Sequence, residues 1–369
     1  MIVSVLQENL LKALTKTGRN IPAKPQLPVL QNVLIKTDSG GLTLTTTNLE
    51  TTEIVRTGAK VEEDGEMCVS SRLLTELVMS LPRETVKMTI SEGSLVLSCL
   101  GTTATMQGTP GSEFPPLSGE GRADRVPLDK NKLTEALSSV LFSAAEDEGR
   151  PILTGVKIFS EDGAAVFAST DGYRLAVKKL ELPLKDNLDL IIPAKALIEV
   201  VKTGQEDKEN KTVLFSESEN GQLWFVAGDT EIITRKIEGE YPDFKKIIPA
   251  KFSTRTVFEK EELSRAVKSA AIFARDNANI IRIHIENQTV VVSANTPSVG
   301  ENKIEFETKV DGEGGDIAFN SRFLLELLNN FVGDELIFEM TGSLNPGVFR
   351  PAKDESYLHI IMPVRVSAS

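Results

Sequence analysis

The sequence has few of the residues that carry most enzyme chemistry. Its 369 residues include only two cysteines, two histidines, one tryptophan and three tyrosines. Cys68 and Cys99 are too few for a disulfide framework or a thiolate metal site, so we expect two reduced, half-buried thiols. His284 shares a strand with Glu286, whereas His359 stands alone, and a metal site needs three or more ligands. We therefore predict no metal, no cofactor and a structural role for His284.

Motifs for phosphate binding and nucleophilic catalysis are also missing. The Gly-rich residues 311–316 lack the Lys-Ser/Thr pair and the strand-to-helix turn of a phosphate loop, so we interpret them as a flexible hairpin. The sequence has no Gly-x-Ser-x-Gly elbow and no histidine partner for a serine. An enzyme is the main competing class, and these absences argue against it. We predict a protein without catalytic activity.

Long apolar runs and an excess of positive charge are lacking too. No 18 consecutive residues are apolar and uncharged, and the chain does not open with a basic-apolar signal, so we expect a soluble cytoplasmic protein. The formal net charge is −12, from 41 basic and 53 acidic residues. Taken alone, this charge argues against nucleic acid, because binding to phosphates requires Lys and Arg.

What the sequence does contain is a threefold internal repeat. The stretches VSSRLLTELV, IPAKALIEVV and FNSRFLLELL place Arg72, Lys195 and Arg322 in one slot, 123 and 127 residues apart. Four positions later each has a glutamate: Glu76, Glu199 and Glu326. The segments ENLLKAL, NKLTEAL and EELSRAV recur in the same order. This period suits small domains, which we place at residues 1–120, 121–249 and 250–369 and call repeats one, two and three.

Each repeat shows the pattern helix, strands, helix, strands. Helical periodicity predicts helices over residues 5–19, 71–83, 129–141, 193–203, 259–275 and 321–330. In the first of these, Leu6 shares a face with Leu10 and Leu14. Alternating stretches around turns predict strand pairs, the last being ELIFEM with YLHIIMPV. The fold class is therefore α+β, with two helices and antiparallel sheets in each of three similar domains.

The predicted helices carry a net positive charge, whereas the rest of the chain is acidic. The six predicted helices sum to +5, which leaves −17 for the rest of the chain. Basic helices inside an acidic shell would suit a hollow body threaded by a polyanion. The alternative is that these are ordinary solvated helix charges. The residues in question are Lys12, Lys16, Arg72, Lys195, Lys202, Arg265, Lys268 and Arg322.

Five segments resemble one known family, in order along the whole chain. They are residues 21–50 with LPVLQNVLIK and LTLTTTNLE, 150–153 (RPIL), 169–177 (STDGYRLAV), 240–244 (EYPDF) and 361–365 (IMPVR). The chain resembles the bacterial DNA polymerase III β subunits, the sliding clamps.

The resemblance implies a ring-shaped processivity factor. Two three-domain chains would join head to tail as a homodimer around duplex DNA, with helices lining the hole and sheets outside. The implied partners are duplex DNA, the replicative polymerase, the clamp loader and other DNA-processing proteins. The alternative is a non-catalytic scaffold of repeated domains that binds proteins and never encircles DNA.

In such a ring, basic side chains would attract phosphates loosely and without sequence information. Lys24 lies where the family has a DNA-contacting basic residue, whereas the corresponding loop of repeat two, residues 146–150, is more acidic than a DNA contact requires. The expected DNA contacts are Lys24, Arg72, Lys195, Lys202, Arg265, Lys268 and Arg322.

The resemblance also implies a pocket for short partner peptides that end in Leu and Phe, between the second and third domains. A groove of Leu, Ile, Met and Pro suits an apolar anchor, and the flexible Met362 suits several partners. The matching residues are Leu153, Thr170, Gly172, Tyr173, Arg174, Leu175, Pro242, Ile247, Ile360, Ile361, Met362, Pro363, Val364 and Arg365. Tyr173 and Lys246 stand where relatives often carry His and Arg. The alternative is that these residues form a turn, a strand end and core.

Ile272 and Phe273 match apolar residues that the family places at the subunit joint. An apolar pair there is typical of a stable homodimer interface. The alternative is an internal core pair.

Overall fold

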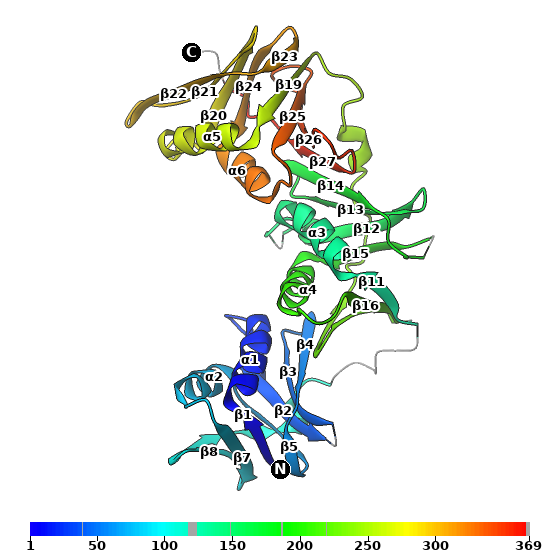
Figure 1. Cartoon of the computed structure of the whole chain (residues 1–369), viewed down its shortest axis with the longest axis vertical. Helices are drawn as coiled ribbons and strands as arrows, with labels where there is room; N and C mark the ends of the chain where they lie inside the picture. Colours follow the sequence, from blue (N-terminus) through cyan, green and yellow to red (C-terminus); the bar gives the residue numbers. More distant parts are fainter. Residues whose placement is uncertain (39, 117–123, 148, 186, 219, 367–369) are drawn as a thin grey trace. The chain divides into compact units, whose positions relative to one another are not determined.

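The computed structural model describes all residues except 39, 117–123, 148, 186, 219 and 367–369. The chain divides into two compact units. Unit 1 contains residues 1–134 and 195–236, and unit 2 contains residues 135–194 and 237–369. Each unit therefore combines a terminal repeat with part of repeat two (Figure 1). None of the helices in the described part of the chain is long and apolar enough to cross a bilayer.

The six predicted α-helices are confirmed. They are α1(Gln7–Thr17), α2(Ser71–Ser80), α3(Lys130–Val140), α4(Ala194–Glu206), α5(Lys260–Ala274) and α6(Ser321–Asn330). The starts of α2 and α6 are capped, because the side chains of Ser70 and Asn320 accept hydrogen bonds from the first-turn amides of Leu73 and Arg322. Within the terminal repeats, α1 packs against α2 and α5 against α6.

Unit 1 contains two antiparallel sheets. The five-stranded sheet has the order β5(Lys60–Glu63), β1(Ile2–Leu6), β7(Thr85–Ser91), β8(Ser94–Cys99), β9(Thr102–Gln107). The nine-stranded sheet has the order β10(Thr109–Pro110), β6(Gly65–Ser70), β2(Asn32–Asp38), β3(Gly41–Thr47), β4(Thr51–Thr57), β18(Thr230–Arg235), β17(Gln222–Ala227), β16(Thr212–Glu217), β11(Val126–Asp129). Because β4 pairs with β18, backbone hydrogen bonds join repeat one to repeat two.

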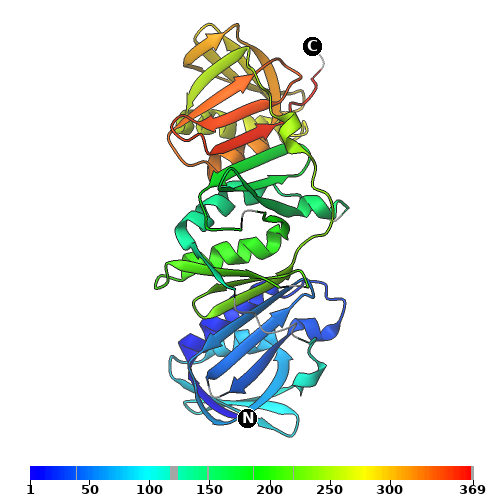
Figure 2. The ribbon, with the colours of Figure 1, turned by 90° about the vertical axis from the view of Figure 1, so that its right-hand side faces the viewer.

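Unit 2 repeats this design. Its nine-stranded sheet has the order β15(Asp189–Pro193), β12(Gly155–Glu161), β13(Ala164–Thr170), β14(Arg174–Leu180), β27(Tyr357–Ile361), β26(Gly347–Pro351), β25(Glu335–Met340), β19(Thr254–Glu259), β23(Lys309–Gly312). The four-stranded sheet has the order β22(Gly300–Glu307), β21(Thr289–Thr296), β20(Ile280–Glu286), β24(Gly315–Asn320). Here β14 pairs with β27, so the same kind of seam joins repeat two to repeat three (Figure 2).

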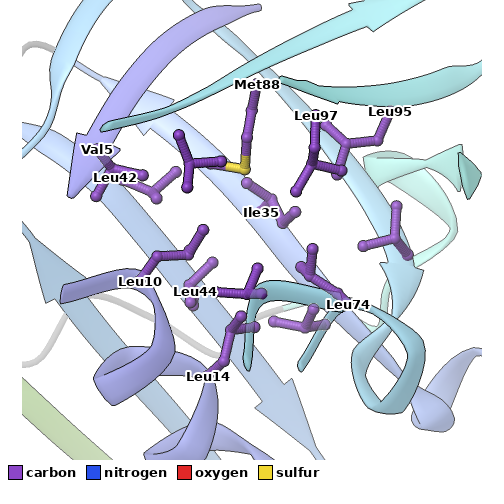
Figure 3. Close-up of a cluster of buried hydrophobic side chains, with 14 of the residues drawn as sticks. Val5, Leu10, Leu14, Ile35, Leu42, Leu44, Leu74, Met88, Leu95 and Leu97 are labelled. Carbon is purple, nitrogen blue, oxygen red and sulfur yellow. The ribbon is translucent and has the colours of Figure 1, made fainter. Parts of the chain in front are cut away.

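The core of repeat one lies between its helices and two sheets (Figure 3). Leu10 and Leu14 from α1 and Leu74 from α2 are fully buried. They lie with Ile35, Leu42 and Leu44 of the nine-stranded sheet and Val5, Met88, Leu95 and Leu97 of the five-stranded sheet. Alternate residues of β3 and β8 supply this core, which is the period-2 pattern of a half-buried strand. The helix pair is thus held by its apolar stripe, which leaves its polar stripe outside.

Two strand predictions were wrong. Residues 311–316 are not a hairpin, since β23 pairs with β19 in one sheet and β24 pairs with β20 in the other. The segment crosses between sheets, and Gly312 has φ +106° with the carbonyl oxygen of Ser253 only 1.9 Å from where a Cβ would lie. A side chain has no room at that crossing. Likewise β25 and β27 do not pair, because β26 lies between them. That strand begins with glycine and ends with proline, which are weak strand formers.

The prediction for Leu6 was also wrong. Leu6 ends β1 and is 48% exposed, so it does not share the buried face of α1. A short strand directly precedes each of the six α-helices named above: β1, β6, β11, β15, β19 and β24. Each of these strands has about six residues or fewer. A predicted helix that begins a few residues too early therefore includes the last apolar residue of the preceding strand.

Candidate nucleic-acid and peptide sites

The predicted DNA-contacting residues are all exposed. Lys24 lies in the loop before η2(Pro28–Gln31), and the others lie on helices. These are Arg72 on α2, Lys195 and Lys202 on α4, Arg265 and Lys268 on α5, and Arg322 on α6. The capped starts of α2 and α6 put Arg72 and Arg322 in equivalent first turns. The structure therefore gives these cations access to a solvent-borne polyanion, and contact with DNA stays a prediction.

Lys16 does not behave as a solvated helix charge. It is 4% exposed, and its Nζ donates to Asp229 Oδ1 at 2.6 Å and to Thr230 Oγ1 at 3.0 Å. The interpretation of Lys16 as a possible polyanion contact was therefore wrong. The side chain instead holds α1 against β18, and burial with an ionic partner satisfies its charge.

A basic cleft in unit 1 was not foreseen from the sequence. It has a volume of about 820 Å³ and lies between α1, the end of α2 and the end of α4. Its basic lining consists of Lys12, Lys16, Arg19, Arg83 and Lys208, and its acidic lining of Glu8 and Glu206. Arg83 and Lys208 lie in loops that follow helices. In a loop no helical periodicity predicts which way a side chain points. Only Lys12, at an exposed helical position, could have been assigned to this cleft in advance.

A buried carboxylate lies behind this cleft. Glu53 on β4 is 1% exposed, and neither side-chain oxygen has a hydrogen-bond partner among the described residues. Burial, together with the charge of Glu199, raises the pKa of Glu53 to about 8. Arg19, which is in η1(Gly18–Asn20), faces Glu199 at 3.9 Å and also contacts Glu206. At neutral pH Glu53 is therefore mostly protonated within a network that joins β4 to α4.

The predicted peptide-site residues come together in unit 2. Leu175 pairs with Ile360 and Arg174 with Ile361 across the β14–β27 seam, and the amide of Met362 donates to the carbonyl of Tyr173 at 2.8 Å. Thr170 ends β13, Gly172 lies in the turn before β14, and the chain after β27 supplies Pro363, Val364 and Arg365. Leu153 comes from η5(Pro151–Thr154), Ile247 from η6(Phe244–Ile247), and Pro242 from just before it.

These residues form a buried base with an exposed apolar rim. Leu153, Leu175 and Ile360 belong to one hydrophobic cluster with Tyr241 and Phe244, and Ile361 is fully buried. In contrast, Tyr173, Ile247 and Met362 are 60%, 39% and 37% exposed. The alternative of a turn, a strand end and core also describes these positions, so the peptide site stays a prediction; the exposed apolar side chains of the rim offer area to a partner.

Arg174 is a brace within this site. Its Nε lies 3.1 Å from Asp171 Oδ2, and its Nη2 donates to the carbonyl of Phe142 at 2.5 Å. Its Nη1 contacts Glu326 on α6, and the guanidinium lies 4.7 Å from the ring centroid of Phe323. With 8% exposure, Arg174 directs its donors into the protein. The sequence analysis missed these partners, although Glu326 had been marked by its place in the repeat.

Arg150 is a second residue beside the site that the sequence analysis did not select. Gly172 has φ +91°, and a Cβ there would lie 2.8 Å from Arg150 Nη1. Glycine thus allows the turn and lets the exposed guanidinium lie against it.

The predicted joint residues lie at the end of α5. Ile272 is 56% exposed and Phe273 is half-buried. The alternative of an internal core pair therefore fails for Ile272. On α2, Leu73 and Met79 are 53% and 64% exposed. Two long sheet edges are open as well, at β9 and β22.

The two histidines lie in different environments. His284 Nδ1 lies 2.8 Å from Asp316 Oδ1 on the surface, while His359 is fully buried and stacked on Phe142. Burial lowers the pKa of His359 to about 3, so the ring is neutral. No group of three or more His, Cys, Asp or Glu suited to a metal ion exists among the described residues. Cys68 and Cys99 are free thiols, as predicted, but they are buried and not half-buried.

Comparison with known proteins supports one family. The family models for the N-terminal, central and C-terminal domains of the DNA polymerase III beta subunit match residues 1–118, 127–243 and 245–365. A curated "Beta sliding clamp" from Staphylococcus aureus is 27% identical over 99% of both chains.

Solved structures agree. The DNA polymerase III beta chain from Streptococcus pneumoniae has a TM-score of 0.93 at 26% identity, covering 99% of this chain and 100% of that one. A sliding clamp from Pseudomonas aeruginosa bound to griselimycin has a TM-score of 0.91 at 24% identity, with the same coverage. The fold is the three-domain clamp fold, and the chain belongs to the DNA polymerase III beta subunit family.

Proposed function

We propose that this chain is a DNA sliding clamp. Two copies form a ring around duplex DNA and tether the replicative polymerase and other DNA-processing proteins to it, without any catalysis of their own. The observation that carries the proposal is full-length agreement, domain by domain, with DNA polymerase III beta subunits, among them proteins named sliding clamps. Those relatives are bacterial, which supports a cytoplasmic place of action on the chromosome.

Such a ring holds DNA by enclosing it. The basic residues proposed to face the duplex are spread over α2, α4, α5 and α6, while the chain as a whole carries −12. Phosphates recur about every 1.7 Å along the duplex axis, so contacts from many similar helices do not all fit at one position. Sliding then meets low barriers, and a modest attraction is sufficient. The basic cleft beside α1 adds Lys12, Arg83 and Lys208 to the proposed phosphate contacts.

Partners dock, in this proposal, on the apolar rim around Met362. Burial of apolar area gives about 25 cal/mol per Å², so a peptide with two large apolar side chains gains several kcal/mol on Tyr173, Ile247 and Met362. A clamp of the same fold binds griselimycin, which supports a ligand site on this fold. The partners would be the replicative polymerase and the clamp loader, each through a short apolar motif.

The ring is proposed to close between the end of α5 in one copy and α2 in the other. Exposed Ile272 on one side and exposed Leu73 on the other support this pairing. The open edges of β22 and β9 can extend a sheet across the same joint.

Retention on circular DNA tests the function. The chain is loaded with clamp loader and ATP onto a nicked circular plasmid and passed through a sizing column in high salt. We expect it to stay with the circle and to be lost once a restriction enzyme linearises the plasmid. Loss from the intact circle would refute encirclement, because only non-topological binding depends this strongly on salt. Equal behaviour on circle and line would favour the protein-binding scaffold.

A further inference from the structure

The three glutamates of the internal repeat have different partners. Glu199 of repeat two faces Arg19 of repeat one and also accepts from Lys202 at 2.8 Å. Glu326 of repeat three contacts Arg174 of repeat two. In both cases an arginine from the preceding repeat approaches the glutamate. Among the described residues, the one ion-pair partner of Glu76 of repeat one is Arg72, one turn earlier on its own helix; the side chains of Arg72 and Glu76 are 89% and 61% exposed.

The two arginines also reach the same place on the preceding repeat. Arg19 lies in η1, directly after α1. Arg174 comes from β14, but its Nη2 donates to the carbonyl of Phe142 in η4(Leu141–Ser143), directly after α3. In both joints, therefore, a guanidinium lies where the first helix of one repeat ends and meets the glutamate on the second helix of the next repeat. The joints differ in the origin of the arginine but share this position.

The neighbouring apolar position shows the same pattern. Ala196 of repeat two is fully buried. Phe323 of repeat three is covered by Arg174 at 4.7 Å and stacks on Tyr173 at 6.5 Å. The equivalent Leu73 is 53% exposed. Leu73 is thus exposed at a position that is buried in repeat two and is covered by Arg174 of the preceding repeat in repeat three.

We propose that Glu76 is the acceptor for Arg275 of a second copy of this chain. Arg275 directly follows α5, the first helix of repeat three, which is the place that the guanidinium occupies in both internal joints. It is exposed and forms no ion pair within the described part of the chain. Ile272 lies one turn earlier on the same helix, so the same approach covers Leu73. This inference rests on the proposed head-to-tail ring and names the contact that fixes its joint.

The existing pair of Glu76 with Arg72 does not compete strongly. Both side chains are exposed, and exposed ion pairs contribute little. The order Arg then Glu at i, i+4 is also the weaker one on a helix. A contact that excludes water is stronger, since charge pairs at interfaces depend on desolvation.

A two-copy ring contains this joint twice, so each substitution acts twice. If loss of the pair weakens one joint about tenfold, dissociation of the ring increases about a hundredfold. The joint is also directional, because residue 76 of each copy meets residue 275 of the other. Two differently substituted chains can therefore complement each other.

The test is analytical ultracentrifugation of Glu76→Arg and Arg275→Glu, alone and mixed. We expect each variant alone to be monomeric at concentrations where the unsubstituted chain is dimeric. In a 1:1 mixture both joints of a mixed dimer pair opposite charges, so dimers should return. Glu181→Arg, at an exposed position outside the joint, is the matched control and should leave dimerisation unchanged.

The outcomes separate the inference from the ring. Dimers of Glu76→Arg as tight as those of the unsubstituted chain, or no recovery on mixing, overturn the proposed pair while the ring stands. A monomeric unsubstituted chain overturns the ring itself. Both positions are exposed, so circular dichroism and thermal unfolding of each variant should match the parent, and a variant that unfolds is replaced by Glu76→Gln and Arg275→Gln.

Discussion

Substitution of Glu53 by glutamine should make unit 1 more stable at alkaline pH. Glu53 is 1% exposed and neither of its oxygens has a hydrogen-bond partner among the described residues. Burial first, and then the charge of Glu199, raise its pKa from the ordinary 4.5 to about 8. Glutamine has nearly the shape of the protonated acid and cannot ionise, so it keeps the packing and removes the pH dependence.

The sign follows from the direction of the shift. Because the pKa of Glu53 is higher in the folded chain than in the unfolded chain, folding favours the bound proton. The stabilising contribution is fully present below pH 4.5 and is lost as pH rises through about 8. Each unit of pKa corresponds to about 1.4 kcal/mol, so the whole window is worth up to ~5 kcal/mol. The advantage of Glu53→Gln should therefore grow with pH and level off above about 8.

Trp224 provides a local probe for this measurement. It is the only tryptophan of the chain, lies on β17, and packs with Ile54 and Ile233 across the β4–β18 seam. Urea unfolding followed by its fluorescence at pH 6, 7, 8 and 9 gives the free energy of unfolding of this region for both proteins. A difference between Glu53→Gln and the parent that stays constant with pH would refute the reasoning, and Glu50→Gln, at an exposed position directly before β4, is the control.

Three further predictions concern the other sites. Met362→Asp should weaken binding of a synthetic peptide ending in Leu-Phe more than about a hundredfold in calorimetry, because it places a charge in an apolar rim. Leu344→Asp is the control, since Leu344 is 61% exposed elsewhere in unit 2, and it should leave peptide binding unchanged. Unchanged binding by Met362→Asp would mean that the peptide site lies elsewhere. Ile272→Asp should give monomers in sedimentation, and a persistent dimer would place the joint elsewhere. Burial, aided by the charges of Glu66 and Glu113, raises the pKa of Cys68 to about 11. At pH 8, iodoacetamide should therefore alkylate Cys68 about a hundredfold more slowly in the folded protein than in the protein unfolded by urea, as followed by peptide mapping. Equal alkylation rates in the two states would mean that the folded protein has an accessible thiolate.

Much of the fold could be predicted because helix and strand periods are local. All six helices and most hairpins follow from the spacing of apolar residues, as in Leu10 and Leu14 on α1. The wrong predictions involve partners far away in the sequence. Whether residues 311–316 form a hairpin or cross from one sheet to the other depends on β19 and β20, the strands with which β23 and β24 pair. The composition of β26 is too weak for a strand to be predicted there without its neighbours.

The residues of the predicted peptide site could be gathered from the sequence, but their contacts could not. The resemblance gathered Tyr173, Met362 and the residues around them, and the structure brings these together at one seam. The resemblance could not show that Arg174 is buried against Glu326 or that Lys16 pairs with Asp229. The sequence around a basic residue does not indicate which distant carboxylate will contact it in the fold. Glu53 was missed for the same reason.

The β4–β18 seam has a consequence for synthesis of the chain. Thr51 and Thr234, which face each other across it, are 183 residues apart. At about 5–20 residues per second, a ribosome exposes β4 roughly 10–40 s before its neighbour exists. A bare strand edge invites pairing with other nascent chains, and an inward-pointing charge is one natural protection. In that interval Glu53 is in water and ionised, so it repels premature pairing, and it takes up its proton when α4 and β18 finally cover it.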